Sequence, residues 1–431
     1  MNIAVIGTGY VGTVTGITFA EVCGHDVLFL DIRQDKLDTI RSGKAPFYEP
    51  GLNELISKNL SRLKVSTDFS AVKSADMIFL CVGTPSNKDG SVDLSQLFSA
   101  VEGLIPHLQD GKFRVVVTKS TVPPTTGEKV IRRLEGVGLT LGKDFGYVSN
   151  PEFLREGNAV YDSLHPDRIV VGCKDERTKD VMQQLYSPFQ CAKVFTTVET
   201  AEMIKYVANA LLATKISFAN EIARLCAKLN VDVYEVMDAV ALDGRINRAF
   251  LNAGLGFGGS CFPKDVKGLL SLYGLFSVDA PLLKSVLSVN STQPLLAVDL
   301  CEEKLGGLKN KKVALIGLAF KEDTDDVRET KAYDILKELL ARGAQVYAYD
   351  PVAVASFTRE YPELSARIQF YDSLKETLNA SDVIIIQTAW KEIKSLSPSD
   401  FKIHQVIIDG RRALDKRLFK DKNMNYFGIG W

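Results

Sequence analysis

The stretch NIAVIGTGYVG, Asn2–Gly12, joins a short run of apolar residues to three glycines spaced as G-x-G-x-x-G. The apolar run is typical of a buried strand, and the residues after the glycines continue with helical spacing. In such a strand–turn–helix unit the glycines permit a tight turn, a close approach of the backbone to a pyrophosphate, and tight packing of the helix. The pyrophosphate then lies on the helix N-terminus. The stretch therefore predicts a dinucleotide-binding unit.

An acidic residue strengthens this prediction. The next apolar run, DVLFLDI, carries Asp31, 24 positions after Gly7. A carboxylate there accepts hydrogen bonds from a ribose diol and repels a 2′-phosphate, which favours NAD over NADP. The alternative is a glycine turn that serves only the fold.

Outward from this stretch, short apolar runs alternate with helical patterns as far as about Glu199, which predicts βαβ units and a parallel sheet. Thr200 to Asn230 then contains neither Gly nor Pro, and its apolar residues recur at helical spacing. Near Asn310 the strand–helix alternation restarts with KKVALIGLAFK. We therefore expect an α/β protein with two Rossmann-like, doubly wound parallel-sheet domains joined by a long central helix. The expected domains are 1–198, 199–305 and 306–431.

The second α/β segment contains Gly317 but neither of the later glycines, so a second NAD is not expected there. Lys321 follows the end of its first strand, where parallel sheets bind ligands. Lys321 is either a ligand for a phosphate or sugar hydroxyl or a solvated lysine in a charged loop.

Composition narrows the class of protein. The 431 residues are 46% hydrophobic and carry a formal net charge of -1, so no nucleic-acid or membrane partner is indicated. The first residues enter a strand pattern directly, without a secretory leader, and no apolar run is long enough for a membrane span. These observations predict a soluble, cytoplasmic protein.

Seven cysteines at irregular spacing, without C-x-x-C, indicate neither a disulfide framework nor a metal site.

One cysteine has unusual surroundings. Cys261 lies in GFGGSCFPKD, Gly256–Asp265, among three glycines and just before Lys264 and Asp265. A nearby positive charge favours the thiolate, so Cys261 is a candidate nucleophile. The alternative is a buried structural thiol.

Other polar residues lie at strand ends or on the long helix. Thr121 lies in STVPPTTG at the end of a strand, and it either projects toward the cofactor crevice or belongs to an ordinary turn with two prolines. Glu152 and Glu156 in NPEFLREG are candidate general bases or merely solvated carboxylates. Lys205 and Asn209 are one helical turn apart and share a face. An ammonium and an amide there either stabilise negative charge on oxygen or form part of a polar surface.

Taken together, the motifs resemble the UDP-glucose dehydrogenase family, which also includes GDP-mannose and UDP-N-acetylhexosamine dehydrogenases. The resemblance covers essentially the whole chain and rests on GTGYVG, STVPPTTG, NPEFLREG, AEMIKYVANA, GRINRAFLNAGLGFGGSCFPKD, GLAFKEDTDDVRET and DGRR. It implies a four-electron oxidation of a sugar's primary alcohol to a carboxylate with two NAD, through a cysteine thiohemiacetal and a thioester. UDP-glucose is the first choice of substrate, with GDP-mannose or a UDP-N-acetylhexosamine as the alternative.

The resemblance also implies roles for single residues. Cys261 would be the nucleophile and Glu152 the base for the hydrolytic water; Lys205 and Asn209 would stabilise oxyanions, and Asp265, with Thr121, would assist proton transfer. The expected NAD-binding residues are Gly7, Gly9, Tyr10, Val11, Gly12, Asp31, Lys36, Thr84, Thr121, Glu156, Lys264 and Arg328. The expected substrate-binding residues are Glu152, Phe153, Leu154, Arg155, Lys205, Asn209, Arg245, Phe250, Leu251, Asn252, Ala253, Gly254, Gly258, Lys321 and Arg411.

The resemblance further implies a homodimer in which Arg245 reaches the partner's active site. Two other classes of function remain open from the residues alone. A two-electron β-hydroxyacid dehydrogenase also joins a Rossmann domain to long helices, but it needs no cysteine. A non-enzymatic NAD-responsive protein needs neither Cys261 nor the Lys205–Asn209 pair.

Overall fold

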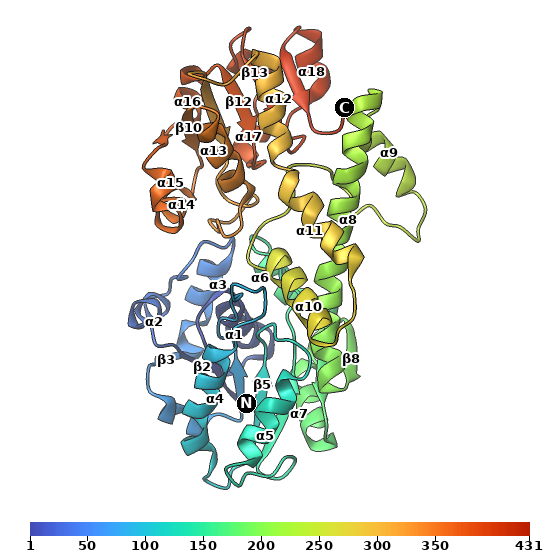
Figure 1. Cartoon of the computed structure of the whole chain (residues 1–431). Helices are drawn as coiled ribbons and strands as arrows, with labels where there is room; N and C mark the ends of the chain where they lie inside the picture. Colours follow the sequence, from blue (N-terminus) through green and yellow to red (C-terminus); the bar gives the residue numbers. More distant parts are fainter. The chain divides into compact units, whose positions relative to one another are not determined.

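The computed structural model describes residues 1–431, which divide into two compact units. Unit 1 comprises Met1–Ala208 and Lys267–Leu272, and unit 2 comprises Asn209–Val266 and Tyr273–Trp431. The helix α8 (Val198–Leu229) runs from the first into the second, and it matches the long helix expected over Thr200–Asn230 (Figure 1). None of the helices, α8 included, is both long and apolar enough to cross a membrane.

Unit 1 is built on an eight-stranded sheet in the order β3-β2-β1-β4-β5-β6-β7-β8, in which only the β6–β7 pair is antiparallel. The strand order reverses between β1 and β4, and open sheets of this type bind ligands beyond the carboxyl ends of the strands at such a point. The strands are β1 (Asn2–Ile6), β2 (Asp26–Leu30), β3 (Leu63–Ser66), β4 (Met77–Leu80), β5 (Arg114–Thr118), β6 (Phe145–Ser149), β7 (Arg168–Cys173) and β8 (Ala192–Thr196).

Helices cover both faces of this sheet. Side chains that alternate along β1 belong to two separate apolar cores, Val5 to one and Ala4 and Ile6 to the other, as expected for strands buried on both sides. The helices are α1 (Tyr10–Cys23), α2 (Gln34–Arg41), α3 (Leu52–Asn59), η1 (Leu60–Arg62), η2 (Phe69–Ser74), α4 (Ser95–Leu108), α5 (Thr126–Glu135), α6 (Ala159–Leu164) and α7 (Glu176–Tyr186).

Unit 2 contains the second parallel sheet, with six strands in the order β11-β10-β9-β12-β13-β14. The two parallel sheets and the linking helix confirm the predicted fold class. The strands are β9 (Lys312–Ile316), β10 (Gln345–Tyr349), β11 (Gln369–Phe370), β12 (Val383–Ile386), β13 (Val406–Asp409) and β14 (Asn425–Gly428). The helices are α9 (Val233–Val240), α10 (Phe262–Leu275), α11 (Pro281–Thr292), α12 (Leu295–Leu305), α13 (Lys331–Ala341), α14 (Val354–Glu360), α15 (Pro362–Ser365), α16 (Leu374–Ala380), α17 (Lys391–Lys394), η3 (Pro398–Asp400) and α18 (Lys416–Asp421). The middle of α10, Lys267–Leu272, belongs to unit 1.

Buried amides hold the loop that leads to Cys261. Asn220 on α8 accepts a hydrogen bond from Gly254 N at 2.8 Å, and Gln293 Nε2 donates to Gly254 O at 2.8 Å. Asn290 on α11 accepts from Phe257 N at 2.7 Å and donates to Phe257 O at 3.0 Å. Because buried backbone groups must be paired, these three amides fix the path of the loop in place of a strand or helix.

The glycines of this loop have a structural reason that the sequence did not suggest. At both Gly258 and Gly259 the side that would carry a side chain faces the protein. A Cβ at Gly258 would lie 2.4 Å from Glu329 O, and one at Gly259 would lie 2.7 Å from the ring of Phe320. Gly259 also has φ +83°, in the region that favours glycine.

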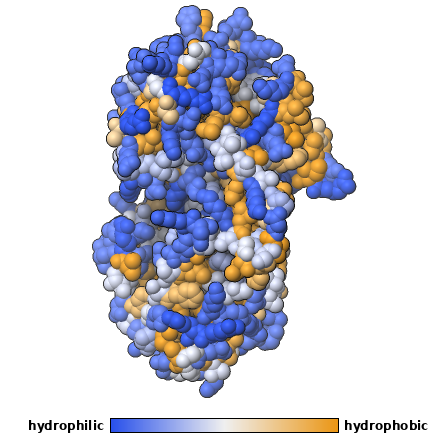
Figure 2. Space-filling model, in the orientation of Figure 1, coloured by the Kyte–Doolittle hydropathy of each residue, from blue (hydrophilic) through white to orange (hydrophobic).

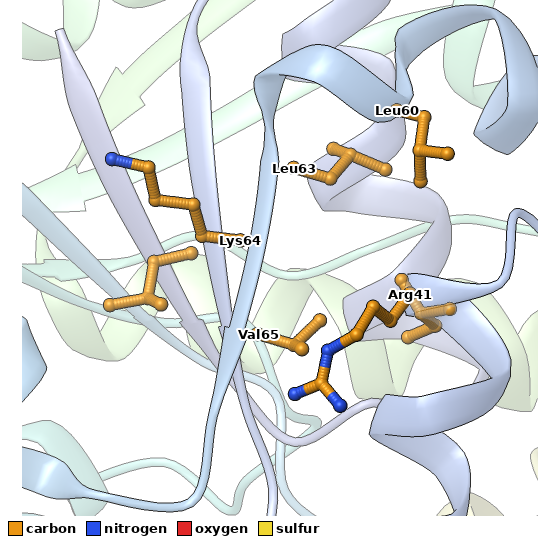
Figure 3. A pocket seen from close by; sticks show the side chains of 7 residues that line it. Arg41, Leu60, Leu63, Lys64 and Val65 are labelled. Atoms are coloured by element: carbon orange, nitrogen blue, oxygen red, sulfur yellow. The ribbon is translucent and has the colours of Figure 1, made fainter.

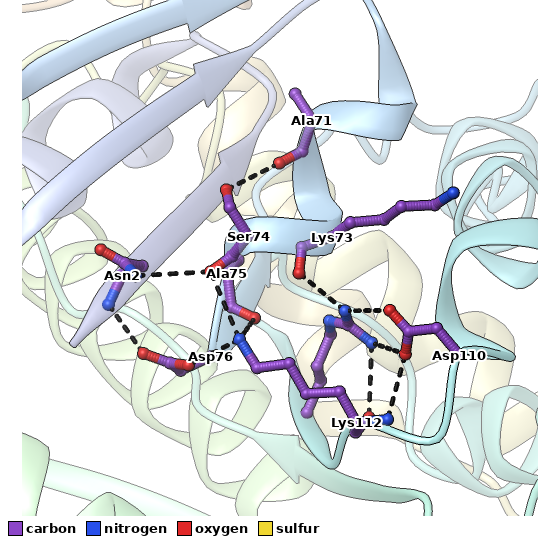
Figure 4. A network of polar contacts seen from close by, with 9 residues as sticks. Asn2, Ala71, Lys73, Ser74, Ala75, Asp76, Asp110 and Lys112 are labelled. Atoms are coloured by element: carbon purple, nitrogen blue, oxygen red, sulfur yellow. Dashed lines mark hydrogen bonds and ion pairs between the residues drawn. The ribbon is translucent and has the colours of Figure 1, made fainter.

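A polar network closes the amino ends of β1, β4 and β5, the edge opposite the ligand-binding one (Figure 4). Arg114, fully buried on β5, donates to both carboxylate oxygens of Asp110 at 2.7 and 2.6 Å and to Lys73 O at 2.7 Å. Lys112 Nζ donates to Ala75 O at 2.9 Å and pairs with Asp76 at 2.8 Å. The hydrogen bonds from Arg114 hold the pKa of Asp110 well below its ordinary value.

We expect Asp110→Ala to destabilise unit 1, because the buried Arg114 guanidinium would lose its carboxylate. Removing one partner of a buried ion pair lowers the free energy of unfolding by about 3 kcal/mol at the lower end of the usual range. We expect this lower value because the side chain of Asp110 is 38% exposed. Thermal unfolding at neutral pH measures the loss. Asp180→Ala, at an exposed position on α7, is the control, and equal melting temperatures for the two variants would contradict the role of Asp110.

We expect Gly259→Ala to destabilise unit 2 by about 2 kcal/mol, because a non-glycine residue at positive φ is strained and its Cβ would meet Phe320. Gly274→Ala on α10 is the matched control, since a Cβ there meets no atom within 4 Å. Chemical unfolding compares the two variants. A Gly259→Ala protein as stable as the wild type would show that the loop can shift.

Candidate functional site

The glycine turn after β1 has the form that a dinucleotide requires. Gly7 has φ +95°, and a Cβ there would lie 2.6 Å from Cys81 O. A Cβ at Gly12 would lie 1.9 Å from Gly7 O, so this glycine permits the close packing of α1 on the turn. A Cβ at Gly9 would meet nothing within 4 Å, which leaves the backbone at the start of α1 open to a ligand. The turn therefore fits the pyrophosphate of NAD.

Asp31 directly follows β2 and braces this turn. Its Oδ2 accepts hydrogen bonds from Thr8 N at 2.7 Å and Thr8 Oγ1 at 2.6 Å, and its Oδ1 accepts from Arg33 N at 2.9 Å. Burial opposes ionisation of Asp31, but these hydrogen bonds and the charge of Lys36 keep its pKa below the ordinary value. Asp31 is therefore an ionised acceptor beside the turn, as a ribose diol requires.

Other residues expected to bind NAD lie around the same sheet edge. Thr84 Oγ1 donates to Thr121 O at 2.9 Å and so joins the loops after β4 and β5. The Tyr10 hydroxyl accepts a hydrogen bond from Gly157 N at 2.7 Å, which ties the first turn of α1 to the loop that carries the buried Glu156. Val11 packs against the apolar core of unit 1.

A buried ion pair joins two of the expected catalytic residues. Lys205 Nζ on α8 donates to Glu152 Oε1 at 2.9 Å, and the side chains of Lys205 and Glu152 are only 3% and 6% exposed. Leu154 N donates to Glu152 Oε2 at 2.5 Å. Burial raises the pKa of Glu152, but the charge and hydrogen bond of Lys205 outweigh it, and the pKa stays below the ordinary value. Glu152 is thus a carboxylate that stays ionised although it is buried.

The residues beside Glu152 are held by different partners. The ring of Phe153 lies under the guanidinium of Arg168 at 3.9 Å and 5.5 Å from Lys205 Nζ. Arg155 is exposed and forms a two-pronged ion pair with Asp162, at 2.9 and 2.5 Å. Phe153 therefore borders the Lys205–Glu152 pair, whereas the charge of Arg155 is neutralised by its neighbour.

In unit 2, three of the expected residues form one chain of hydrogen bonds. Asn209 Nδ2 on α8 donates to Asp265 Oδ2 at 2.5 Å, and Lys264 Nζ donates to Asp265 Oδ1 at 2.6 Å. Asp265 is 1% exposed. Asn209 and Lys205 lie on successive turns of one helix, as the sequence predicted.

Cys261 directly precedes α10. Its carbonyl accepts the first hydrogen bond of that helix, from Asp265 N at 2.8 Å, and its Sγ lies 3.5 Å from Ser260 Oγ. The sequence suggested Lys264 as the positive charge near this thiol, but the ammonium of Lys264 is bonded to Asp265. Cys261 lies at the positive, amino-terminal end of α10, and such a position stabilises a thiolate.

The segment Phe250–Gly254, expected to bind substrate, follows α9. Leu251 and Ala253 are buried, Asn252 is exposed, and Phe250 has φ +65° with its ring 6.0 Å from that of Phe262. Gly254 is clamped by the amides described above. The segment is therefore an ordered loop whose exposed side chain is Asn252.

The expected cationic ligands differ in how they are held. Arg411 donates from Nε to Gln387 O at 2.7 Å and from Nη1 to Gly256 O at 3.1 Å, so it braces the glycine loop. Lys321 Nζ lies 5.8 Å from the ring centre of Phe320. Arg328 is paired with Asp326 at 2.6 Å, and Arg245, 89% exposed, with Asp243 at 2.5 Å. In this chain Arg245 and Arg328 therefore lie on the surface.

The equivalent of Asp31 in unit 2 is Asp350, which follows β10 and is 4% exposed. Its Oδ2 accepts from Leu318 N, Ala319 N and Trp390 Nε1 at 2.7, 3.1 and 3.1 Å. A Cβ at Gly317, the only glycine of this turn, would lie 2.4 Å from Thr388. Protein groups therefore occupy the acceptor and the turn that a dinucleotide would use.

Sequence reasoning missed the residues that position the site. Asn220 and Asn290 lie on helices and Gln293 follows the last residue of α11, but their partners are backbone groups far away in the sequence. Glu49 is 4% exposed and accepts from Gly157 N and Ala159 N, both at 2.7 Å. The only signal available was the presence of amides within otherwise apolar helical faces.

A pocket of about 460 Å³ lies away from these residues, at the outer edge of the unit 1 sheet (Figure 3). Leu60, Leu63 and Val65 supply apolar lining, and Arg41 and Lys64 border it. It contains none of the expected catalytic or binding residues, so it is separate from the candidate site.

Three family models match the chain. The NAD-binding domain of the UDP-glucose/GDP-mannose dehydrogenase family matches residues 1–190, the central domain of that family matches 199–292, and its UDP-binding domain matches 314–416.

Relatives match over the full length. A UDP-glucose 6-dehydrogenase of Bacillus subtilis is 42% identical over 100% of this chain and 98% of its own. One of Haloferax volcanii is 40% identical over 97% and 98%. The solved structure of a UDP-glucose dehydrogenase from Pyrobaculum islandicum has a TM-score of 0.92 at 38% identity and covers 100% of this chain and 98% of its own. This chain therefore belongs to the UDP-glucose/GDP-mannose dehydrogenase family and is an NAD-dependent oxidoreductase that acts on a UDP-sugar.

Proposed function

We propose that this enzyme oxidises UDP-glucose to UDP-glucuronate in two NAD-dependent steps, with Cys261 as the covalent nucleophile. The observation that carries the proposal is the position of Cys261 at the start of α10, one turn before Asp265, which is bonded to Asn209. A two-electron dehydrogenase needs no such cysteine. Across the reaction, one alcohol, two NAD⁺ and one water yield one carboxylic acid, two NADH and two protons, so four electrons leave the sugar.

The first step converts the primary alcohol to an aldehyde. The hydroxyl loses its proton, and the carbon gives a hydride to NAD. The ammonium of Lys205 and the amide of Asn209 stabilise the negative charge that develops on oxygen. Thr121, in the loop after β5, assists the proton transfer.

The second step needs a tetrahedral carbon, because an aldehyde has no hydride on such a carbon to give. The Cys261 thiolate adds to the aldehyde carbon, and the oxygen takes a proton, which yields a thiohemiacetal. Loss of this proton and of a hydride to a second NAD leaves a thioester on Cys261. The positive end of α10 favours the thiolate that begins this step.

Water then hydrolyses the thioester. Glu152 accepts a proton from the attacking water, a C–O bond forms, the C–S bond breaks, and the thiolate of Cys261 is restored. A general base must be ionised, and Glu152 meets this requirement because Lys205 holds its pKa below the ordinary value despite burial. Asp265 positions water and assists proton transfer.

Bound NAD would supply the hydride acceptor for both oxidations. We assign its binding to the glycine turn and Asp31, with Tyr10, Val11, Lys36, Thr84, Thr121, Glu156, Lys264 and Arg328. We assign the sugar nucleotide to Phe153–Arg155, Phe250–Gly254, Gly258, Lys321 and Arg411, in addition to the catalytic residues. The domain boundaries 1–198, 199–305 and 306–431 and a cytoplasmic location belong to the same proposal.

The comparisons favour UDP-glucose over other sugars. Relatives named for UDP-glucose are 42 and 40% identical, whereas the UDP-D-ManNAc dehydrogenase of Pyrococcus horikoshii is 30% identical, with a TM-score of 0.87. A pocket for an acetamido sugar has a different polar and steric demand at C2.

We also propose that the protein is a homodimer, with Arg245 reaching the partner's active site. Leu211, Phe218, Leu225 and Leu229 are 53 to 63% exposed and recur every seven or four residues along α8, so they form one apolar face. Figure 2 shows hydrophobic residues gathered where Figure 1 draws α8 and α9. A long helix with a regular apolar stripe suits antiparallel pairing with its own copy.

We expect two NADH per UDP-glucose consumed, because both oxidations occur before the product leaves. Absorbance at limiting substrate measures this ratio, and the same assay with GDP-mannose and UDP-N-acetylhexosamines tests the choice of sugar. A ratio of one, with free aldehyde released, would refute the four-electron chemistry.

Cys261→Ser should stop sustained formation of UDP-glucuronate. A serine hydroxyl does not add to the aldehyde as a thiolate does, and an ester on serine is not hydrolysed as readily as a thioester. Cys191→Ser, at a partly buried cysteine of unit 1, should retain wild-type turnover. Unimpaired uronate formation by the Cys261→Ser variant would remove the nucleophile from the proposal.

Phe218→Asp should yield a monomer, because a charge at the centre of the apolar face cannot be buried against a second copy. Leu418→Asp, at a 51% exposed position on α18, is the control and should leave the mass in light scattering unchanged. A dimeric Phe218→Asp variant would place the interface elsewhere.

A further inference from the structure

Lys119 is a charged residue at the sheet edge to which the proposed chemistry gives no role. It directly follows β5, and Asn150 directly follows the neighbouring strand β6, whose Ser149 is paired with Thr118. Lys119 Nζ donates to Asn150 Oδ1 at 3.0 Å. Lys119 therefore lies beside the first residue of the loop that carries Glu152.

Asn150 is a rigid partner. It is fully buried, its backbone N donates to Thr118 O at 2.9 Å, and its Nδ2 donates to Val170 O at 2.7 Å. Its Oδ1 also accepts from the hydroxyl of Tyr186. The hydrogen-bond partner of the Lys119 ammonium is thus a neutral amide that cannot move, and the charge of the ammonium is left to act on its other neighbours.

The titratable neighbours of Lys119 come from three elements. Glu152 lies in the loop after β6, Lys205 on α8 and Cys81 directly after β4. Burial lowers the pKa of Lys119 to about 8, with Cys81 and Glu152 opposing the shift and Lys205 adding to it. Burial raises the pKa of Cys81 to about 12, so this thiol is neutral near pH 7.

At neutral pH the group therefore contains two cations and one anion. Lys205 is the direct partner of Glu152 at 2.9 Å, and Lys119 contributes a second favourable charge to the same carboxylate. The excess positive charge is located where the proposed chemistry creates a negative oxygen. A single ion pair would leave Glu152 without a counter-charge whenever Lys205 turned toward that oxygen.

We propose that Lys119 is a positioning residue whose ammonium keeps Glu152 ionised while Lys205 is engaged with the oxygen of the substrate. The inference rests on the proposed role of Glu152 as the base for thioester hydrolysis. Lys119 need not touch the substrate, because it acts through its charge on Glu152 and through its hydrogen bond to Asn150.

The test is the pH dependence of UDP-glucuronate release in single turnovers with NAD and UDP-glucose. Removing the charge in Lys119→Met raises the pKa of Glu152, so the acidic limb of the profile should move upward by about one pH unit, as expected for loss of a nearby opposite charge. On the acidic limb itself, at pH values below the pKa of Glu152 in both proteins, the release rate should fall about tenfold. Above pH 9, where Lys119 is itself neutral, the variant and the wild type should agree within about twofold.

Two further variants separate charge from structure. Lys119→Arg preserves the charge and should keep the acidic limb in place, with a rate within about threefold of wild type. Lys129→Met removes a charge from an exposed position on α5 and should change nothing. If Lys119→Met fails to fold, Lys119→Gln, which can still donate to Asn150, carries the same test.

The outcomes distinguish the role of Lys119 from the proposed function. A Lys119→Met profile parallel to that of the wild type at every pH, or an Arg variant as impaired as the Met variant, would overturn the role of Lys119. A wild-type enzyme that yields one NADH per substrate would instead overturn the proposed function, whatever Lys119 does.

Discussion

The unbroken backbone hydrogen bonding of α8 is the constraint on which the rest of the structure depends. Three of its polar residues have buried partners: Lys205 bonds to Glu152, Asn209 to Asp265, and Asn220 to Gly254. Since burial of an unpaired ammonium or amide costs several kcal/mol, each pair fixes the register of a loop against the helix. A shift of α8 by one residue would break all three contacts at once.

The sequence predicted well what depends on local pattern. Glycine spacing, the acidic residue after β2, the alternation of strands and helices and the long helix all follow from interactions within a few residues or from periodic burial. The hydrogen bonds from buried amides to the loop before Cys261 could not be predicted, because nothing near Asn290 in the sequence indicates that its partner is Phe257. The packing at Gly259 could not be predicted for a related reason, since the ring of Phe320, which excludes a side chain there, lies in a distant loop. The functions of Arg245 and Arg411 rest on resemblance alone.

The two sheets share a topology but differ in what their first turns can do. After β2, Asp31 braces the glycine turn through Thr8 and stays partly exposed beside the open backbone of Gly9. After β10, the buried Asp350 accepts hydrogen bonds from backbone amides and an indole, and the turn is packed against Thr388. A doubly wound sheet therefore provides an edge that suits ligands, and the residues at that edge decide which ligand is accepted.

The occupied turn around Asp350 has a consequence for the order of events in the proposed reaction. With a dinucleotide turn in only one of the two sheets, the two hydrides must leave through the same NAD site, one after the other. A reduced cofactor has to depart and an oxidised one arrive between the two oxidations, while the half-oxidised sugar stays behind. The enzyme is then processive with respect to the sugar and distributive with respect to the cofactor, and its uridine-binding contacts must outlast those to the nicotinamide.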